Sequence, residues 1–188
     1  MDPVVIVIIV AAVILVVGIV LVIVSRARSR SRRAALRSQF GDEYDRVISE
    51  YGQSNGEREL RSRLKKRREL EVRELDGSER DRYAKAWESA QSTFVENPST
   101  GLRDADLLVQ QVMRDRGYPV ERFEERAKLI SVDHPDLVEH FRSAHQTSVA
   151  TEEAGSAGTE DMRQAMVDHR YLFDALLQGG DAERTRRM

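Results

Sequence analysis

The chain has 188 residues, of which 30 are Lys or Arg and 32 are Asp or Glu, giving a formal net charge of −2. It contains no cysteine, which excludes disulfide bonds, cysteine-ligated zinc and a thiol nucleophile. The length that remains after position 24 suits one domain with a modest core.

The chain begins with a long apolar run. Residues 4–24 contain 16 Val or Ile in 21 positions and no polar side chain. At about 1.5 Å per residue, a helix of this length spans about 31 Å, close to the roughly 30 Å of a hydrocarbon core. A cleaved signal peptide is the alternative, but its apolar region is about 7–15 residues long and follows basic residues, whereas Asp2 and Pro3 precede this run. The sequence therefore predicts a transmembrane anchor over residues 1–25.

Six arginines follow the apolar run and are the candidate lipid-contacting residues: Arg26, Arg28, Arg30, Arg32, Arg33 and Arg37. Because positive charge is retained on the cytoplasmic side, they predict a single-pass protein of the cell membrane, with its N-terminus outside and its C-terminal domain in the cytoplasm. We expect residues 26–39 to form a basic juxtamembrane segment that contacts anionic lipid. The Ser-Arg pattern also occurs in RNA-binding tracts, but its place beside a membrane span disfavours nucleic acid as a partner.

Charge divides the rest of the chain into two zones. Residues 26–74 carry 15 basic against 9 acidic residues, a net charge of +6, and residues 75–188 carry 15 against 22, a net charge of −7. A basic stem is attracted to an anionic leaflet, whereas an acidic distal domain is repelled from it. The distal domain is then available to a protein partner.

Apolar residues recur at three- and four-residue spacing throughout, so the expected fold class is all-α. Residues 40–77 are expected to form a charged helical neck, with one helix over 40–51 and another over about 56–75. Residues 63–68 hold five cations and show no clear core face, so we expect this part to be largely solvated or to meet a partner or the leaflet. Four of these side chains form a second candidate lipid patch: Lys65, Lys66, Arg67 and Arg68.

Residues 78–178 are expected to form a compact bundle of about five helices. The first begins near a cap at Ser78 and buries Tyr83, Trp87, Ala90, Phe94 and Val95; the others cover 101–116, 120–130, 135–146 and a last helix that starts at a Thr159 cap. An aromatic ligand cage around Trp87 is the alternative to a core. We expect a flexible loop at 147–158 and a disordered tail at 179–188.

The histidines are the candidates for metal or acid–base chemistry. His134, His140 and His145 lie within twelve residues, and Asp136 shares a helix face with His140. The pattern lacks an HExxH motif, however, and His140 and His145 are five residues apart, which favours surface pairs. His169, on the inner face of the last helix, is expected to be a hydrogen-bonded core residue. We therefore assign no catalytic, cofactor-binding or metal-binding residue.

Three segments carry a resemblance: FGDEYD at 40–45, RGYP at 116–119 and SVDHPDLVEHF at 131–141. On these segments the chain resembles an uncharacterised family of actinobacterial proteins with an N-terminal apolar anchor, an arginine-rich neck and a helical domain, often labelled only as membrane or secreted proteins. The resemblance covers most of the chain and implies no activity, cofactor or catalytic residue. In architecture alone the chain is similar to ATP synthase b subunits and some division proteins, although its Pro and Gly breaks and its aromatic core depart from the b subunit.

These observations together predict a non-catalytic protein-interaction or scaffold module at the cytoplasmic face of the membrane. Its expected partners are anionic lipid, through the basic neck, and an unknown protein, and no cofactor is expected. One alternative is a helical protein that is secreted or lies on the envelope side after signal cleavage. The other is a metal-dependent sensor or enzyme that uses His134, Asp136 and His140.

Overall fold

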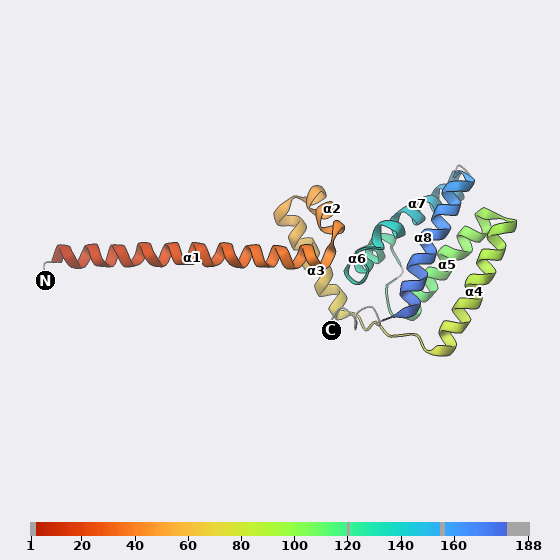
Figure 1. Ribbon diagram of the computed structural model, residues 1–188, viewed down its shortest axis with the longest axis horizontal. Helices are drawn as coiled ribbons and strands as arrows, with labels where there is room; N and C mark the ends of the chain where they lie inside the picture. The colour runs from red at the N-terminus through yellow and green to blue at the C-terminus, as the bar shows by residue number, and fades with distance from the viewer. Residues whose placement is uncertain (1–2, 120, 155–156, 180–188) are drawn as a thin grey trace. The chain divides into compact units, whose positions relative to one another are not determined.

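The computed structural model describes residues 3–119, 121–154 and 157–179, with the side chains at 3–14, 16, 22, 27, 29 and 154 outside the description. The described residues form eight helices and no strand, so the predicted all-α class is confirmed. In chain order the helices are α1 (Pro3–Phe40), α2 (Asp42–Tyr51), α3 (Gln53–Glu69), α4 (Gly77–Glu96), α5 (Pro98–Asp115), α6 (Phe123–Asp133), α7 (Val138–Ala154) and α8 (Thr159–Gln178) (Figure 1). They belong to two compact units, Met1–Glu57 and Arg58–Met188.

The first unit consists of α1, α2 and the start of α3. Glycines with positive φ end the first two of these helices, Gly41 at 52° and Gly52 at 74°, and glycine adopts this region without a Cβ clash. Buried apolar side chains lie where α1 ends and α2 begins: Leu36, Phe40, Tyr44 and Val47. A Cβ on Gly56 would lie 2.8 Å from Ile48 Cδ1, so the start of α3 packs closely on α2. The helix expected over 40–51 is therefore divided at Gly41.

The expected transmembrane anchor lies on α1. Among the residues that the structure describes, no helix is both long enough and apolar enough to cross a membrane. Most of the apolar run falls on residues 3–14, whose side chains lie outside the description.

The second unit contains a bundle of five helices, α4 to α8, within its described residues, as predicted. Asn97 joins α4 to α5: its side-chain oxygen accepts a hydrogen bond from the Thr100 N–H at 3.1 Å, and Pro98 occupies the first turn of α5. Gly101 allows the two helices to meet, because a Cβ there would lie 2.3 Å from the Phe94 backbone. Helix α4 begins at an Asp76–Glu79 capping box, not at Ser78 as expected.

The core of the bundle is apolar and aromatic. Trp87 of α4 stacks on Phe173 of α8 with ring centroids 4.8 Å apart. The expected interior positions Tyr83, Trp87 and Ala90 are buried, and α5 contributes Leu102, Ala105, Leu108, Val109, Val112 and Met113. The prediction for Val95 is wrong: it is 84% exposed, because α4 ends at Glu96 and the neighbouring Phe94 takes the position against Gly101.

Two further boundaries differ from the sequence analysis. Helix α7 continues to Ala154, so residues 147–154 are helical and the loop expected at 147–158 is wrong for them. Residues 155–156 lie outside the described residues. The Ser148 and Thr151 hydroxyls donate to backbone carbonyls one turn earlier, at 3.0 and 2.7 Å, which keeps these polar side chains compatible with a helix. Gly158, rather than Thr159, is the N-cap of α8. The tail expected at 179–188 lies outside the described residues after Gly179.

Candidate functional site

The apolar side chains of α1 that the structure describes are exposed. The exposed fractions of Leu15, Val17, Ile19, Val20, Leu21, Ile23 and Val24 range from 38% to 65%. Successive residues of an α-helix point about 100° apart, so these seven side chains cover more than half of the circumference. The apolar surface therefore surrounds much of the helix and is not a single stripe facing a protein core.

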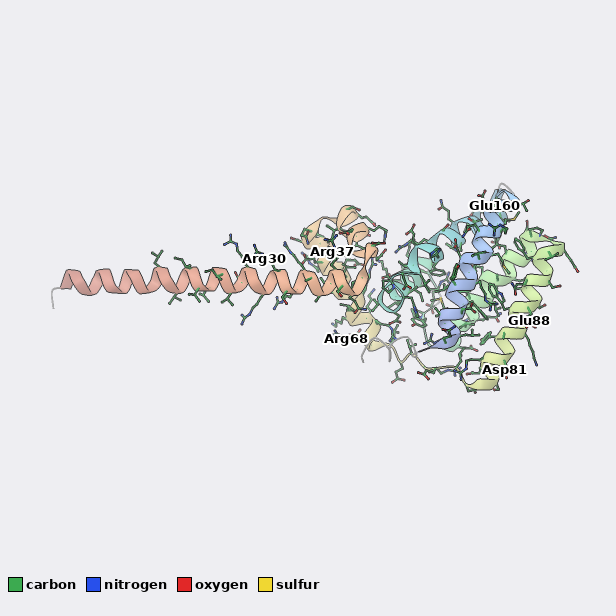
Figure 2. The ribbon with its side chains drawn as sticks, viewed as in Figure 1. Arg30, Arg37, Arg68, Asp81, Glu88 and Glu160 are labelled. Atoms are coloured by element: carbon green, nitrogen blue, oxygen red, sulfur yellow. The ribbon has the colours of Figure 1, made fainter. Side chains whose placement is uncertain are left out.

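The six candidate arginines are all exposed, but they fall into two groups. Arg33 Nε forms an ion pair with Glu57 Oε1 at 3.0 Å, and Arg37 pairs with Asp45 at 2.8 Å. These two contacts hold the start of α3 and α2 against α1. Figure 2 shows Arg30 and Arg37 projecting from α1. No described residue forms an ion pair with the group nearer the apolar run: Arg26, Arg28, Arg30 and Arg32.

The acidic residues of α2 are engaged within the same unit. Arg46 donates to both carboxylate oxygens of Glu43, at 2.8 and 2.9 Å, and to Glu50 at 2.9 Å. The hydrogen bond to Glu43 is the main cause of a raised pKa at Arg46. Tyr44 accepts a hydrogen bond from Gln53 at 2.9 Å, which joins α2 to α3. The first unit is thus held together by paired charges as well as its small apolar core.

The middle of α3, expected to be largely solvated or to meet a partner or the leaflet, is exposed at Lys65, Lys66 and Arg68 but not at Arg63. Arg63 is 2% exposed and donates to Ser131 Oγ of α6 at 3.2 Å and to Glu59 at 3.1 Å. Lys66 bonds to Glu125 at 3.0 Å and lowers the pKa of that carboxyl. Arg67 bonds to Asp133 at 2.5 Å. Apolar periodicity missed this contact because long cationic side chains of α3 form these hydrogen bonds to α6.

The second lipid patch is accordingly rearranged. Lys66 and Arg67 form ion pairs with α6, and Lys65, Lys66 and Arg68 are exposed. Figure 2 labels Arg68 near the end of α3. Four of the exposed cations of this helix recur at three- and four-residue spacing and form one stripe: Arg58, Arg61, Lys65 and Arg68.

The histidines expected as metal ligands do not converge. His140 Nδ1 lies 2.8 Å from Asp168 of α8, which is buried, and no described contact joins His140 to Asp136. His134 is the C-cap of α6, with its N–H donating to the Ile130 carbonyl at 2.7 Å. His145 instead stacks on Phe123, with centroids 3.7 Å apart. Within the described ranges, no group of three or more His, Asp or Glu side chains could hold a metal ion.

His169 lies in the core, as expected, and is fully buried. Its Nε2 is 3.4 Å from Ser148 Oγ and 3.8 Å from Asp106 Oδ1. A hydrolytic triad needs serine and aspartate on opposite ring nitrogens, whereas here both face Nε2. The Ser148 hydroxyl moreover donates to the Ala144 carbonyl at 3.0 Å. The sequence identified His169 but not these neighbours, because Asp106 and Ser148 come from other helices and follow no spacing rule.

The RGYP segment has a structural explanation. Arg116 donates to the Leu176 carbonyl at 2.9 Å and to the Arg73 carbonyl at 3.2 Å, which joins α8 and the segment after α3 to the end of α5. Gly117 has a φ of 91°, and a Cβ there would lie 2.6 Å from the Glu71 carbonyl oxygen. These residues serve packing and carry no evident chemistry.

Comparisons with protein-family models, with curated proteins and with solved structures find no match to this chain. The resemblance to an actinobacterial family stays a prediction from the three sequence segments.

Proposed function

We propose that the protein is a membrane-tethered, non-catalytic interaction module whose α1 is a single-pass anchor. The observation that carries this proposal is the exposed apolar surface of Leu15 to Val24, in one unbroken helix with the arginine-bearing residues that follow. Exposed on most sides, these side chains would be unfavourable in water, at about 25 cal/mol for each Å² of apolar surface. A lipid environment removes that penalty, and a helix satisfies its own backbone hydrogen bonds there.

The arginines nearest the run support lipid contact. Arg26 to Arg32 lie about 3–12 Å beyond Val24 along the helix, at about 1.5 Å per residue. This range corresponds to the headgroup layer and to a Debye length of about 8 Å at physiological salt. Arg33 and Arg37 lie farther out and are ion-paired with Glu57 and Asp45. We therefore assign lipid contact to Arg26, Arg28, Arg30 and Arg32, and a positioning role to the other two.

Topology and partner follow from charge. The positive flank supports a cytoplasmic C-terminal domain and an N-terminus outside. The acidic residues 75–188 are repelled by an anionic leaflet, so the bundle would face soluble partners. Tethering raises the local concentration of the bundle at the membrane, which strengthens even a weak contact with another membrane-bound protein.

Protease accessibility of a C-terminally tagged full-length chain tests the proposal. In cells stripped of their wall, we expect the tag to be protected until lysis, at full mass in the membrane fraction. Digestion in intact cells would contradict the cytoplasmic topology, and a shortened soluble product outside the cells would support the cleaved, envelope-side alternative.

A charge variant tests the role of the arginines in the same assay. Replacing Arg26, Arg28, Arg30 and Arg32 by Gln should let part of the population insert with inverted topology. Replacing Arg33 and Arg37 by Gln is the matched control and should leave the topology unchanged. Equal topology in both variants and the wild type would contradict an orienting role for the first group.

A further inference from the structure

A cluster of polar and ionisable side chains, buried or partly buried, lies where α5, α6, α7 and α8 meet. Its members are Asp106 and Gln110 of α5, Arg126 of α6, His145 and Ser148 of α7, and His169 of α8. Arg126 is 5% exposed and His169 is 0% exposed. Neither membrane anchoring nor partner binding at the surface requires such groups, and each buried polar group lowers stability unless it is paired.

Hydrogen bonding defines the state of His169 at neutral pH. Ser148 Oγ uses its hydrogen to donate to the Ala144 carbonyl, so it can only accept from His169 Nε2. Nε2 then carries the hydrogen of a neutral ring, and Nδ1 is a bare acceptor. Nδ1 is buried and has no hydrogen-bond partner among the described residues. A second proton on Nδ1 would place a charged N–H in the interior with nothing to accept it.

His145 has a related environment. Its ring stacks on Phe123, and its Nδ1 is buried without a hydrogen-bond partner among the described residues. The Arg126 guanidinium lies 5.7 Å from the centroid of the same Phe123 ring. Protonation of His145 would therefore place a second cation beside one that is already buried.

We propose that His169 and His145 form an acid-sensitive lock: protonation of the buried His169 ring and the partly buried His145 ring loosens α8 from α5 and α7. Both rings are contributed by helices that enclose the bundle core, so the added charge acts where those helices pack.

The charges that face these rings oppose one another. Asp106 and Asp168 attract a proton to His169; Asp106, Glu124 and Glu152 attract one to His145, and Arg126 repels it. Burial outweighs the carboxylates: removal from water lowers the pKa of His169 from 6.5 to about 4, and His145 contributes to that decrease. Burial is also the largest cause of the lowered pKa of His145, followed among the lowering causes by Arg126.

The sign of the pH effect follows from these values. A histidine with a lowered pKa in the closed bundle binds its proton more readily once the bundle opens. The stabilisation is complete above about pH 6.5 and is lost as the pH falls toward 4. Over that window one such group raises the opening constant up to about tenfold per pH unit.

Trp87 reports the expected change, because it is the only tryptophan and stacks on Phe173 of α8. Urea unfolding of the full-length chain in detergent micelles, followed by Trp87 fluorescence, should give a lower midpoint near pH 5 than near pH 7.5. His169→Leu should reduce that difference, and His134→Gln, at the C-cap of α6, should keep it. An equal fall in midpoint for the wild type and His169→Leu would overturn the proposal.

A second measurement covers a His169→Leu variant that does not fold. Ring signals of the four histidines are followed by NMR in the isotope-labelled wild-type full chain as the pH is lowered. The His169 ring should remain neutral well below pH 6.5, and its protonation should coincide with loss of Trp87 burial. Titration of His169 at or above 6.5, or protonation without a change at Trp87, would overturn the lock.

Discussion

The apolar part of α1 and the interior of the bundle reverse the usual arrangement of side chains in opposite ways. On α1, large apolar residues such as Leu15 and Leu21 are 65% and 64% exposed. In the second unit, ionisable side chains such as Arg63 of α3 and His169 of the bundle are 2% and 0% exposed. The first arrangement is stable only if something other than water surrounds the helix, and the second only if the charges are paired or absent. The contrast is what the proposed function expects, with an apolar helix in lipid and a domain that contains buried ionisable groups.

The largest effect is expected from placing charge on the apolar helix. The double change Leu15→Asp and Ile19→Asp should make the free energy of membrane insertion less favourable by about 6 kcal/mol, since each Asp near the centre of a span costs about 3 kcal/mol. Membrane fractionation with alkaline extraction measures this as a shift to the soluble fraction. Leu15→Ala with Ile19→Ala is the matched control and should remain in the membrane. If the aspartate pair also remained there, α1 would not be the anchor.

The next largest effect is expected from removing the buried charge of Arg63. Arg63→Ala should lower the free energy of unfolding of the second unit by about 3 kcal/mol, because buried charged hydrogen bonds to Ser131 and Glu59 are lost. Arg58→Ala, on the exposed stripe of α3, should change it by no more than about 0.5 kcal/mol. Urea unfolding followed by Trp87 fluorescence measures both. Similar losses would show that burial of Arg63 is not what stabilises the α3–α6 contact.

A change at the α4–α5 turn tests the close packing of α4 on α5. Gly101→Ala would place a Cβ 2.3 Å from the Phe94 backbone, so the turn must open, at about 2 kcal/mol. Gly77→Ala, also near a helix start, has no atom within 4 Å of the new Cβ and should stabilise by up to about 1 kcal/mol. In thermal unfolding, the midpoint temperature should fall below the wild-type value for Gly101→Ala and rise above it for Gly77→Ala. A neutral Gly101→Ala would mean that the turn is looser than described.

The smallest effect concerns Tyr83 at alkaline pH. Its hydroxyl donates to Asp115 at 2.6 Å, and burial, with that hydrogen bond, raises its pKa from 10.0 to about 12. The neutral phenol therefore stabilises the fold fully below pH 10, and this contribution is lost between pH 10 and 12. Tyr83→Phe should cost about 1 kcal/mol near pH 8 and a smaller amount near pH 11. Tyr171→Phe, on an exposed position of α8, is the control; a pH-independent difference for Tyr83→Phe would contradict the assignment.

The sequence was informative for most helices whose faces are marked by apolar periodicity, with Val95 as an exception. It predicted the all-α class, the helices of the bundle and the interior places of Trp87 and His169, because these follow from which residues share a helix face. It missed the role of Arg63 and its neighbours on α3, because a cationic helix face carries no periodic apolar signal. It also missed the continuation of α7 past residue 147, where small and hydroxyl residues bond within the helix. The partners of His169 come from separate helices, so only the three-dimensional packing brings them together.

The claim that α1 lies in lipid is tested most directly by probe depth. Since the chain contains no cysteine, Val20→Cys and Arg32→Cys each provide a unique attachment point for a nitroxide in vesicle-reconstituted full-length protein. If α1 lies in lipid, the label at position 20 should collide readily with oxygen and be shielded from a water-soluble nickel complex, while the label at position 32 should show the reverse. Equal exposure of both labels to the nickel complex would contradict a membrane anchor in this protein.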